Sequence, residues 1–488
     1  MNITDPLRRL AQVSPNAVAI VRQDDVSITY RELDRTIDFL ARRVLDGGLF
    51  PGNAAAVAIS GPYKFLVLTL ALARLGVACV PDLMPGEKVD FLFTEDPAAA
   101  DRGKRAVVVD RTWWDVPSSS VNVQPVPSFQ EGAAVFRIFP SSGTTGTPKF
   151  VAVSHAMIAD RIFAKWLAVR LPDDARQICF VGAGTHYGFG ALLRVLWVGG
   201  MLVMPTKLEQ IVPFIQRYRV NALVIAPISL QGVVASLPPG FGPIPSLEAI
   251  EVAGSPLSNR LYDLARQRLC ANIISVYGAV EAGAIASAPK PALYDRPGAV
   301  GYVLPGVEVQ AVDDNDVPVP AGTEGVLRVR SGTCAKAYVG DAAVSANVFK
   351  GGWFYPGDVG AVSRDGLLTL GDRASDVINN GGNKVSPQVI EDVLLAMESI
   401  RDAAAFGVPD AMGVTQIWAA IVANGTVDEA ALPALCRERL KEKAPTSFMQ
   451  LRELPRNAAG KILRDELKKM AVAEAETKSD SHSTHSIH

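Results

Sequence analysis

The most regular hydrophobic pattern lies near the start of the chain. Four apolar residues recur there at the spacing of one helix face: Leu33, Ile37, Leu40 and Val44. The preceding Thr29-Tyr30-Arg31-Glu32 has the form of a capping box, in which the Thr and Glu side chains satisfy free backbone N–H groups. Gly47-Gly48 follows the last apolar position. The pattern therefore predicts an amphipathic helix that begins at Tyr30 and ends before Gly47.

Farther along, short β-rich apolar runs alternate with helical stretches such as Ser258–Arg268. The runs are Ala54–Ile59, Ala106–Val109, Leu223–Ala226 and Ile250–Ala253. Strands that alternate with helices are typical of parallel sheets covered by helices. We therefore expect an α/β protein with a large N-terminal region of parallel α/β sheets.

From about Val307 the pattern changes to a period of two residues. Val307–Gln310 and Val326–Val329 alternate in this way, and Gly-rich turns separate such runs. This period is typical of antiparallel strands with one buried face. We expect a small antiparallel β subdomain at this point.

Another unit begins near Arg373. A helix is predicted with Ser386 as its N-cap and Pro387 at its first position, followed by strands at Ala403–Val408 and Gln416–Val422. The polar, Ser-rich end of the chain lacks periodicity. The expected parts are an N-terminal domain over residues 1–372, a smaller α+β C-terminal domain over 373–470 and a disordered tail over 471–488.

Composition and charge narrow the classes of function. The chain has 488 residues, of which 49% are hydrophobic and 20% charged, so it is globular and too long for a small binding module. Its net charge of −2 provides no basic field for nucleic acid or anionic lipid. The longest apolar stretch, Phe65–Ala73, is too short for a membrane span, which takes about 20 residues. We expect a cytoplasmic protein without a membrane span.

The densest chemical signal is the segment Ser141–Lys149, which follows the β-like run Val135–Phe139. Its glycines let backbone N–H groups approach phosphate oxygens, its hydroxyls add donors, and Lys149 adds a positive charge. It is not the P-loop of NTPases, because Pro148 precedes the lysine and Phe150 follows it. The alternative is a solvated polar loop. The candidate phosphate-binding residues are Ser141, Ser142, Gly143, Thr144, Thr145, Gly146, Thr147 and Lys149.

Together with four later segments, this loop resembles the adenylate-forming superfamily, which includes acyl-CoA synthetases, aryl-CoA ligases, peptide-synthetase adenylation domains and beetle luciferases. The segments are Gly254–Ser258, Tyr277–Glu281, Trp353–Asp358 continuing to Arg373, and Pro455–Lys461 followed by Ile462-Leu463-Arg464. The resemblance runs from about Ile28 to Leu467. It implies a C-terminal domain that rotates, and activation of a small-molecule carboxylic acid by ATP and Mg²⁺ as acyl-AMP with release of pyrophosphate.

The resemblance also implies roles for single residues. Glu281 would be the Mg²⁺ ligand, since carboxylate oxygen suits this hard cation. Lys461 would stabilise the charge that accumulates as carboxylate oxygen attacks the α-phosphorus. Glu281, Lys149 and Lys461 are thus the expected catalytic residues, and Lys461 also counts as a nucleotide contact.

The nucleoside contacts follow from the same resemblance. Tyr277 offers a ring face on which adenine can stack. Asp358 can accept both ribose hydroxyls through its two oxygens, and Arg373 adds a further ribose contact. The remaining contacts that the resemblance implies are Gly254, Ser255, Pro256 and Gly278.

The acid and the thiol have their own candidates. His186 and Tyr187 lie where relatives place a gating side chain, with Tyr187 favoured by its spacing to Gly190, although either can be core packing. Gly278 and Ala279 would form the floor of the acyl pocket. No charged residue stands in these segments, so we expect an uncharged carboxylic acid. Gly381 and Gly382 resemble the acyl-CoA synthetase version of the pantetheine passage.

Two positions depart from the family pattern. Val280 stands where the family has a threonine whose hydroxyl contacts phosphate, and Ser375 stands at the hinge position that is usually acidic or lysine. The sequence favours an ATP-dependent carboxylic acid–CoA ligase, closest to the acyl-CoA synthetases, with coenzyme A as co-substrate. The alternatives are an adenylation enzyme that loads the phosphopantetheine of a carrier protein, and a homologue that binds nucleotide or acyl-adenylate without efficient turnover.

Overall fold

The computed structural model describes most of the chain. The described residues are 1–81, 89–98, 105–116, 124–141, 149–371, 378–380, 383–385, 387–409, 415–428, 431–457 and 462–483. Of these, 379–380, 383–384 and 475–483 are described by their backbone alone.

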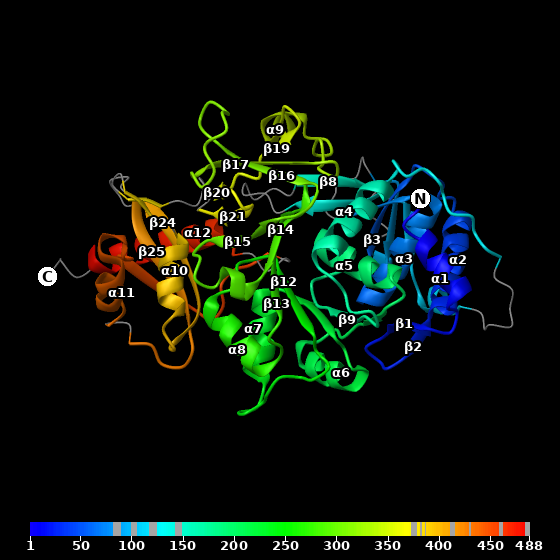
Figure 1. Ribbon diagram of the computed structural model, residues 1–488, viewed down its shortest axis with the longest axis horizontal. Coiled ribbons are helices and arrows are strands. Elements are labelled where there is room, and N and C mark those ends of the chain that lie inside the picture. Colours follow the sequence, from blue (N-terminus) through cyan, green and yellow to red (C-terminus); the bar gives the residue numbers. More distant parts are fainter. Residues whose placement is uncertain are drawn as a thin grey trace.

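Helices lie in the N-terminal part of the chain, up to residue 371, and in the C-terminal part, from residue 378 (Figure 1). They are α1 (Asp5–Val13), α2 (Tyr30–Asp46), α3 (Pro62–Leu75), α4 (His155–Ala168), α5 (His186–Trp197), α6 (Ile211–Tyr218), α7 (Pro227–Ser236), α8 (Asn259–Arg268), α9 (Ala342–Val348), α10 (Pro387–Leu395), α11 (Leu432–Leu440) and α12 (Arg464–Ser483). Single turns of 3-10 helix are η3 (Arg111–Trp114), η4 (Leu208–Gln210), η5 (Lys290–Leu293) and η6 (Lys441–Lys443).

The strands form sheets in both parts as well. The first half of the chain holds β1 (Val18–Val21), β2 (Ser27–Thr29), β3 (Ala54–Ala58), β4 (Ala78–Val80), β5 (Phe91–Thr94), β6 (Arg105–Val108), β7 (Val135–Ser141), β8 (Lys149–Ser154), β9 (Arg176–Cys179), β10 (Met201–Val203) and β11 (Ala222–Ile225). Next come β12 (Ala249–Ala253), β13 (Ile273–Ala279), β14 (Gly283–Pro289), β15 (Ala299–Val303), β16 (Val307–Val312), β17 (Gly325–Ser331), β18 (Phe349–Lys350), β19 (Trp353–Phe354), β20 (Val359–Val362) and β21 (Leu367–Leu370). The last are β22 (Ile378–Asn380), β23 (Asn383–Val385), β24 (Ile400–Pro409), β25 (Thr415–Ala423) and β26 (Ser447–Leu451).

The predicted parallel α/β architecture is confirmed in the N-terminal part. In the large sheet β10, β9, β11, β12 and β13 pair in parallel in that order. A second sheet has the order β6-β5-β3-β4-β7-β8. One hydrophobic core joins the two sheets through α1 to α5, and a second core packs α6, α7 and α8 on the other face of the large sheet. The large sheet is thus covered on both faces, as its apolar central strands require.

Two of the expected helix starts carry side-chain caps. Thr29 and Glu32 form the predicted capping box at the start of α2, and the four apolar positions of that helix are fully buried. Ser258 accepts a hydrogen bond from Leu261 N and caps α8. Within the described residues, no helix is long and apolar enough to cross a membrane.

The strands after Val307 are antiparallel, as predicted. β16 pairs with β17, and β17 pairs with β19 and β20, so these strands continue the large sheet. The period-two pattern reports which face of a strand is buried, and it carries no information about which sheet the strand joins.

The C-terminal part carries a sheet of its own with the order β24-β25-β26, next to α10, α11 and α12 (Figure 1). It contacts the rest of the chain through Arg260 of α8, which donates to the carbonyls of Leu395 and Met397, and through Gln231 of α7, which donates to Arg401 O. The expected boundary at 372–373 lies outside the described residues and stays a prediction, as does the cap at Ser386.

The expected tail is the main difference in this part. Where we expected a structureless segment from Ala471, α12 continues to Ser483, and Ala471 is fully buried beside Leu467. The segment is rich in Ala, Glu and Lys, which are strong helix formers even without an amphipathic period. Residues 484–488 lie outside the described part.

Candidate active site at the carboxyl edge of the large sheet

The predicted nucleotide-binding segments follow neighbouring strands. β12 and β13 are parallel, so Gly254, which follows β12, and Tyr277 near the end of β13 meet at one edge. Ligands of open α/β sheets bind at this carboxyl edge. Gly254 has a φ of +99°, which favours glycine. A Cβ on Gly278 would lie 2.3 Å from Gly283 O, so the backbone admits no side chain there.

Glu281 and Lys149 meet around a tyrosine that the motifs did not single out. The Tyr338 hydroxyl donates to Glu281 Oε1 at 2.7 Å, and Lys149 Nζ lies 5.4 Å from the centre of the Tyr338 ring. Burial and the Glu281 charge raise the pKa of Tyr338, so this phenol stays protonated and donates. The carboxylate and the ammonium thus share one partner at the edge.

Asp358 joins the same edge through Tyr277. The Tyr277 hydroxyl hydrogen-bonds Asp358 Oδ2, and the Asp358 side chain is buried. Tyr277 lies on β13, and Glu281 lies in the turn that follows this strand. Tyr338 therefore links Lys149 with Glu281, and Tyr277 links Asp358 to the strand that leads into the Glu281 turn. Their joint role in nucleotide binding stays a prediction.

The phosphate loop is described only at its two ends. Ser141 ends β7 and lies opposite Lys149, the first residue of β8, in an antiparallel pair. Ser141 is buried, and Lys149 reaches Tyr338. The other loop residues fall outside the described residues, as do the candidates of the C-terminal part, and their roles stay predictions. They are Ser142, Gly143, Thr144, Thr145, Gly146, Thr147, Arg373, Ser375, Gly381, Gly382 and Lys461.

His186 is tied to the turn that carries Glu281. It begins α5, where Thr185 accepts from Gly188 N as the N-cap. Arg161 Nη1 lies 2.8 Å from His186 Nε2 and also donates to Val280 O. Burial and then the Arg161 charge hold the pKa of His186 well below its usual range, so the ring is neutral and accepts this hydrogen bond at Nε2.

Arg161 holds the turn by more than one contact. Its guanidinium donates to the carbonyls of Glu281 and Thr333 as well, and burial lowers its pKa to about 10. The arginine therefore remains charged near neutral pH and fixes the backbone around the candidate metal ligand. The sequence motifs gave no reason to select it.

Tyr187, the residue that spacing favoured as the gate, contacts Glu251 and not the Arg161 side chain that His186 contacts. Its hydroxyl donates to Glu251 of β12, which also pairs with Lys165 of α4 and Arg194 of α5. None of these three charged residues was predicted. The available signal was Glu251 itself, because a charge inside the apolar run Ala249–Ala253 is unusual for a strand covered on both faces.

A hollow of about 270 Å³ lies beside these residues. It lies among α4, the start of β14 and the turns at 304–307 and 331–333, and its lining includes Arg161, Lys165, Ala282 and Ala284. Ala279 and Gly278 pair with Gly283 and Ala284, so the predicted pocket floor adjoins this lining.

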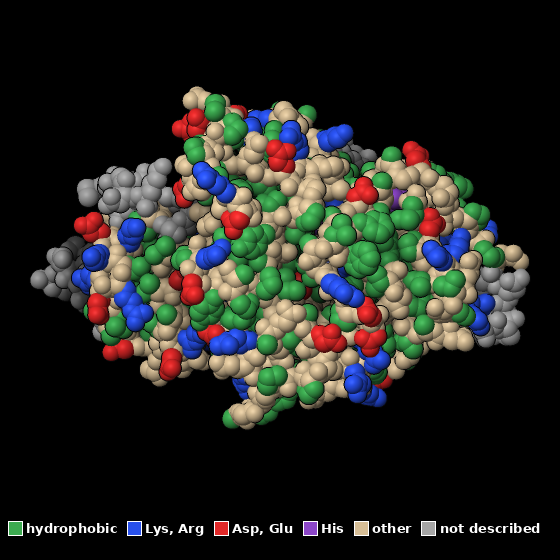
Figure 2. Space-filling model, viewed as in Figure 1, with side chains coloured by type: hydrophobic (Ala, Val, Ile, Leu, Met, Phe, Trp, Pro, Cys, Tyr) green, Lys and Arg blue, Asp and Glu red, His purple; other side chains and the backbone are tan. Residues whose placement is uncertain are grey.

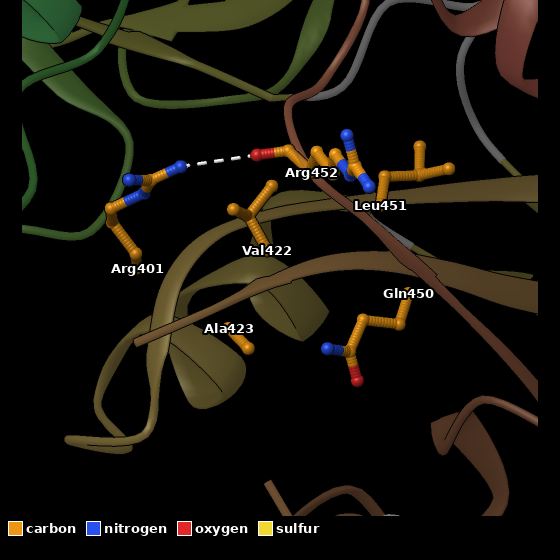
Figure 3. Close-up of a pocket in the computed structure, with 6 residues that line it drawn as sticks. All are labelled: Arg401, Val422, Ala423, Gln450, Leu451 and Arg452. Carbon is orange, nitrogen blue, oxygen red and sulfur yellow. Dashed lines mark hydrogen bonds between the residues drawn. The ribbon is translucent and has the colours of Figure 1, made fainter. Parts of the chain in front are cut away.

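A second hollow, of about 310 Å³, lies on the C-terminal sheet (Figure 3). Its lining comprises Arg401, Val422, Ala423, Gln450, Leu451 and Arg452. Arg401 points across it and donates to Arg452 O at 3.1 Å. No carboxylate or hydroxyl side chain is among these lining residues, so this hollow lacks the groups that the predicted chemistry needs.

Glu281 is the candidate metal ligand at the edge. Among the described residues no group of three or more His, Cys, Asp or Glu side chains could bind an ion. A single carboxylate such as Glu281 suits Mg²⁺ that is bound mainly by substrate phosphates and water.

Basic and acidic side chains are interspersed over the face of the molecule that Figure 2 shows.

Comparisons with known proteins show the family of this chain. The family model described as AMP-binding enzyme matches residues 7–339, and that of the AMP-binding enzyme C-terminal domain matches residues 389–461. The 2-succinylbenzoate–CoA ligase of Bacillus licheniformis is 27% identical over 483 residues, which cover 94% of this chain and 98% of that protein.

Solved structures share the fold over nearly the whole chain. The o-succinylbenzoate CoA synthetase of Bacillus subtilis, in complex with its acyl-adenylate intermediate, matches with a TM-score of 0.85 at 22% identity over 95% of this chain and 98% of that one. The same enzyme with ATP and a magnesium ion matches with a TM-score of 0.84 at 22% identity, over 95% and 99% of the two chains.

Proposed function

Because this chain belongs to the AMP-binding enzyme family, we propose that it is an ATP-dependent carboxylic acid–CoA ligase. The family match confirms the resemblance seen in the motifs, and the solved structures agree with the predicted α/β fold. The observation that supports the proposal is a pair of contacts on one hairpin: Lys149 and Glu281 meet at Tyr338, and Asp358 meets Tyr277 on the strand that leads into the Glu281 turn.

In the first half-reaction an oxygen of the acid attacks the α-phosphorus of ATP. A new P–O bond forms, the bond to the β-phosphate oxygen breaks, and pyrophosphate leaves with acyl-AMP remaining. Asp358 would hold the ribose, Tyr277 would border the base, and Glu281 would bind the Mg²⁺ that accompanies the substrate ATP. Lys149 and Lys461 stabilise the negative charge that grows on the phosphate oxygens.

In the second half-reaction the sulfur of coenzyme A attacks the acyl carbon. The C–S bond forms, the thiol proton is released to water, the bond between the acyl carbon and the phosphate oxygen breaks, and AMP leaves. We propose that the C-terminal domain rotates between the two steps about Ser375 and brings Gly381 and Gly382 to the pantetheine passage. We also place the protein in the cytoplasm, in accord with free cysteines among the described residues.

The test is exchange of labelled pyrophosphate into ATP, measured with a panel of carboxylic acids. Exchange that depends on an acid supports adenylation, and thioester formation on addition of coenzyme A supports the complete reaction. If the acyl group is transferred to a phosphopantetheinylated carrier protein and not to free coenzyme A, the acyl acceptor is the carrier protein. ATP binding without exchange for any acid would support the homologue without efficient turnover, for which the missing hydroxyl at Val280 is the reason.

A further inference from the structure

A buried cluster of charges lies under the candidate acid site. Glu251 on β12 receives hydrogen bonds from Lys165 on α4, from the Tyr187 hydroxyl and from Arg194 Nη2 at 2.9 Å. The charged side chains are between 2% and 11% exposed. We refer to Lys165, Tyr187, Arg194 and Glu251 as the buried cluster.

The buried cluster carries an excess of positive charge and of donors. Two cations face one carboxylate, which leaves a net charge of +1, and both oxygens of Glu251 already accept hydrogen bonds. Arg194 Nε and Nη1 have no hydrogen-bond partner within the described part of the chain. An uncompensated buried charge is costly unless an opposite charge pairs with it. The cluster is therefore suited to an added anion.

The buried cluster lies below the candidate nucleotide edge and beside the 270 Å³ hollow. Glu251 lies three residues before Gly254, so it is about 10 Å below the nucleotide edge at roughly 3.3 Å per strand residue. Lys165 lines the 270 Å³ hollow together with Arg161, which is one helical turn away and holds the Glu281 turn. Lys165 therefore lines the same hollow as the arginine that holds the Glu281 turn.

We propose, on the basis of the proposed function, that the acid carries a second anionic group at its far end, as a dicarboxylic acid does, and that Lys165 binds this group. This departs from the uncharged acid that the motif segments suggested, because Lys165, Arg194 and Glu251 come from other segments. The hollow beside Lys165 suits a small tail.

The protonation states fit this assignment. Burial lowers the pKa of Lys165 to about 8, against the opposing effect of Glu251. Burial alone would raise the pKa of Glu251, but Arg194 and Lys165 outweigh it and lower the value to about 2. Both groups are therefore charged at neutral pH, and Lys165 can donate to an anion.

The experiment compares acids of equal length with one or two carboxylates, such as pentanoate with glutarate and hexanoate with adipate. Exchange of pyrophosphate into ATP gives kcat/KM for each acid in the parent and in Lys165→Met. We expect the parent to favour the dicarboxylates. Loss of a charge-assisted hydrogen bond predicts a decrease of about 10- to 100-fold for dicarboxylates in Lys165→Met, with monocarboxylates nearly unchanged.

Control variants separate selectivity from stability. Lys64→Met removes a lysine of α3 that is paired with Glu95. It should leave the ratio of kcat/KM for dicarboxylates to that for monocarboxylates unchanged. Glu251→Gln removes the carboxylate that neutralises part of the cluster, so it should increase the preference for dicarboxylates. This variant keeps the inference testable even if Lys165→Met fails to fold. Lys165→Arg keeps the charge and should retain the preference.

Two results would overturn the inference. One is a parent that uses both acids of each pair equally well, and the other is a Lys165→Met variant that loses all acids equally, as expected if the cluster only holds α4 and α5 on the sheet. Either result leaves the proposed function intact, since acid-dependent exchange with any acid supports adenylation. Absence of exchange with every acid would instead contradict the proposed function.

Discussion

The sheet edge and the buried cluster beneath it use similar side chains in opposite ways. At the edge, Glu281 and Asp358 each meet a tyrosine hydroxyl and lie outside the strands, next to strand ends. In the cluster, Glu251 sits inside a strand and is already saturated by its partners. We therefore propose that the edge carries out the chemistry that any acid shares and that the cluster distinguishes one acid from another.

The largest expected effect is at the edge. Lys461→Ala should lower the rate of acid-dependent exchange by about 10²–10³-fold for every acid, because one donor to the transition state is lost. ATP binding, measured by calorimetry, should be nearly unchanged. Lys443→Ala, at an exposed lysine of η6, serves as the control. Equal exchange rates in parent and Lys461→Ala would remove this role.

Glu281→Gln tests the metal side of the edge. The amide keeps the shape but not the charge that binds Mg²⁺, and the loss of a charged contact predicts a decrease of roughly 10- to 100-fold. The decrease should be the same for monocarboxylic and dicarboxylic acids, and excess Mg²⁺ should restore part of the rate. A decrease confined to dicarboxylates would erase the distinction between edge and cluster. Glu324→Gln, at an exposed glutamate, is the control.

Tyr338→Phe should have a smaller effect of the same kind. The ring beside Lys149 stays, and only the hydroxyl that donates to Glu281 is lost. Partners of a metal ligand are typically worth 10–100-fold in metal affinity, so we expect the Mg²⁺ requirement to rise about tenfold. Tyr218→Phe, at the end of α6, removes a phenol that pairs with Asp25. This control should leave the Mg²⁺ requirement unchanged. An unchanged requirement in Tyr338→Phe would show that Glu281 does not depend on this hydroxyl.

The smallest effect concerns pH and belongs to the cluster. Protonated Lys165 is the form that binds an anion, so the preference for dicarboxylates should fall as pH rises through its pKa of about 8. A simple titration predicts a decrease of about fourfold between pH 7 and pH 8.5. The groups that face Lys165 are Asp160 and Arg161 on α4, His186, Tyr187 and Arg194 on α5, Cys179 on β9, and Glu251 on β12.

The ratio of glutarate to pentanoate kcat/KM across this range measures the effect, since changes at the edge cancel in the ratio. A ratio that stays constant through pH 8.5 would contradict the role of Lys165.

The fold was predictable where the signal is local. The capping box at Thr29 and the alternation of strands and helices depend on neighbouring residues alone, and both are confirmed. The joining of β16 and β17 to the large sheet depends on pairing between distant strands, which a period of two does not encode. The helix beyond Ala471 was missed because its helical propensity is not accompanied by an apolar stripe.

The same distinction explains which candidate site residues the sequence singled out. Gly254, Tyr277, Glu281 and Asp358 stand in short contiguous motifs, so a few adjacent letters identify them. Lys165, Arg194, Glu251 and Tyr338 come from the interiors of helices, strands and a turn, and only the packing of α4 and α5 on the sheet brings the first three together. A lysine on a helix is usually solvent-exposed, so its sequence gives no warning of burial.

The most direct test of the account is a crystal structure with a non-hydrolysable acyl-adenylate analogue of glutarate. We predict ribose oxygens on Asp358, the base against Tyr277, and the distal carboxylate of the acyl group on Lys165. A nucleotide bound away from Lys149, Glu281 and Asp358 would contradict the central claim that this edge is the site of adenylation.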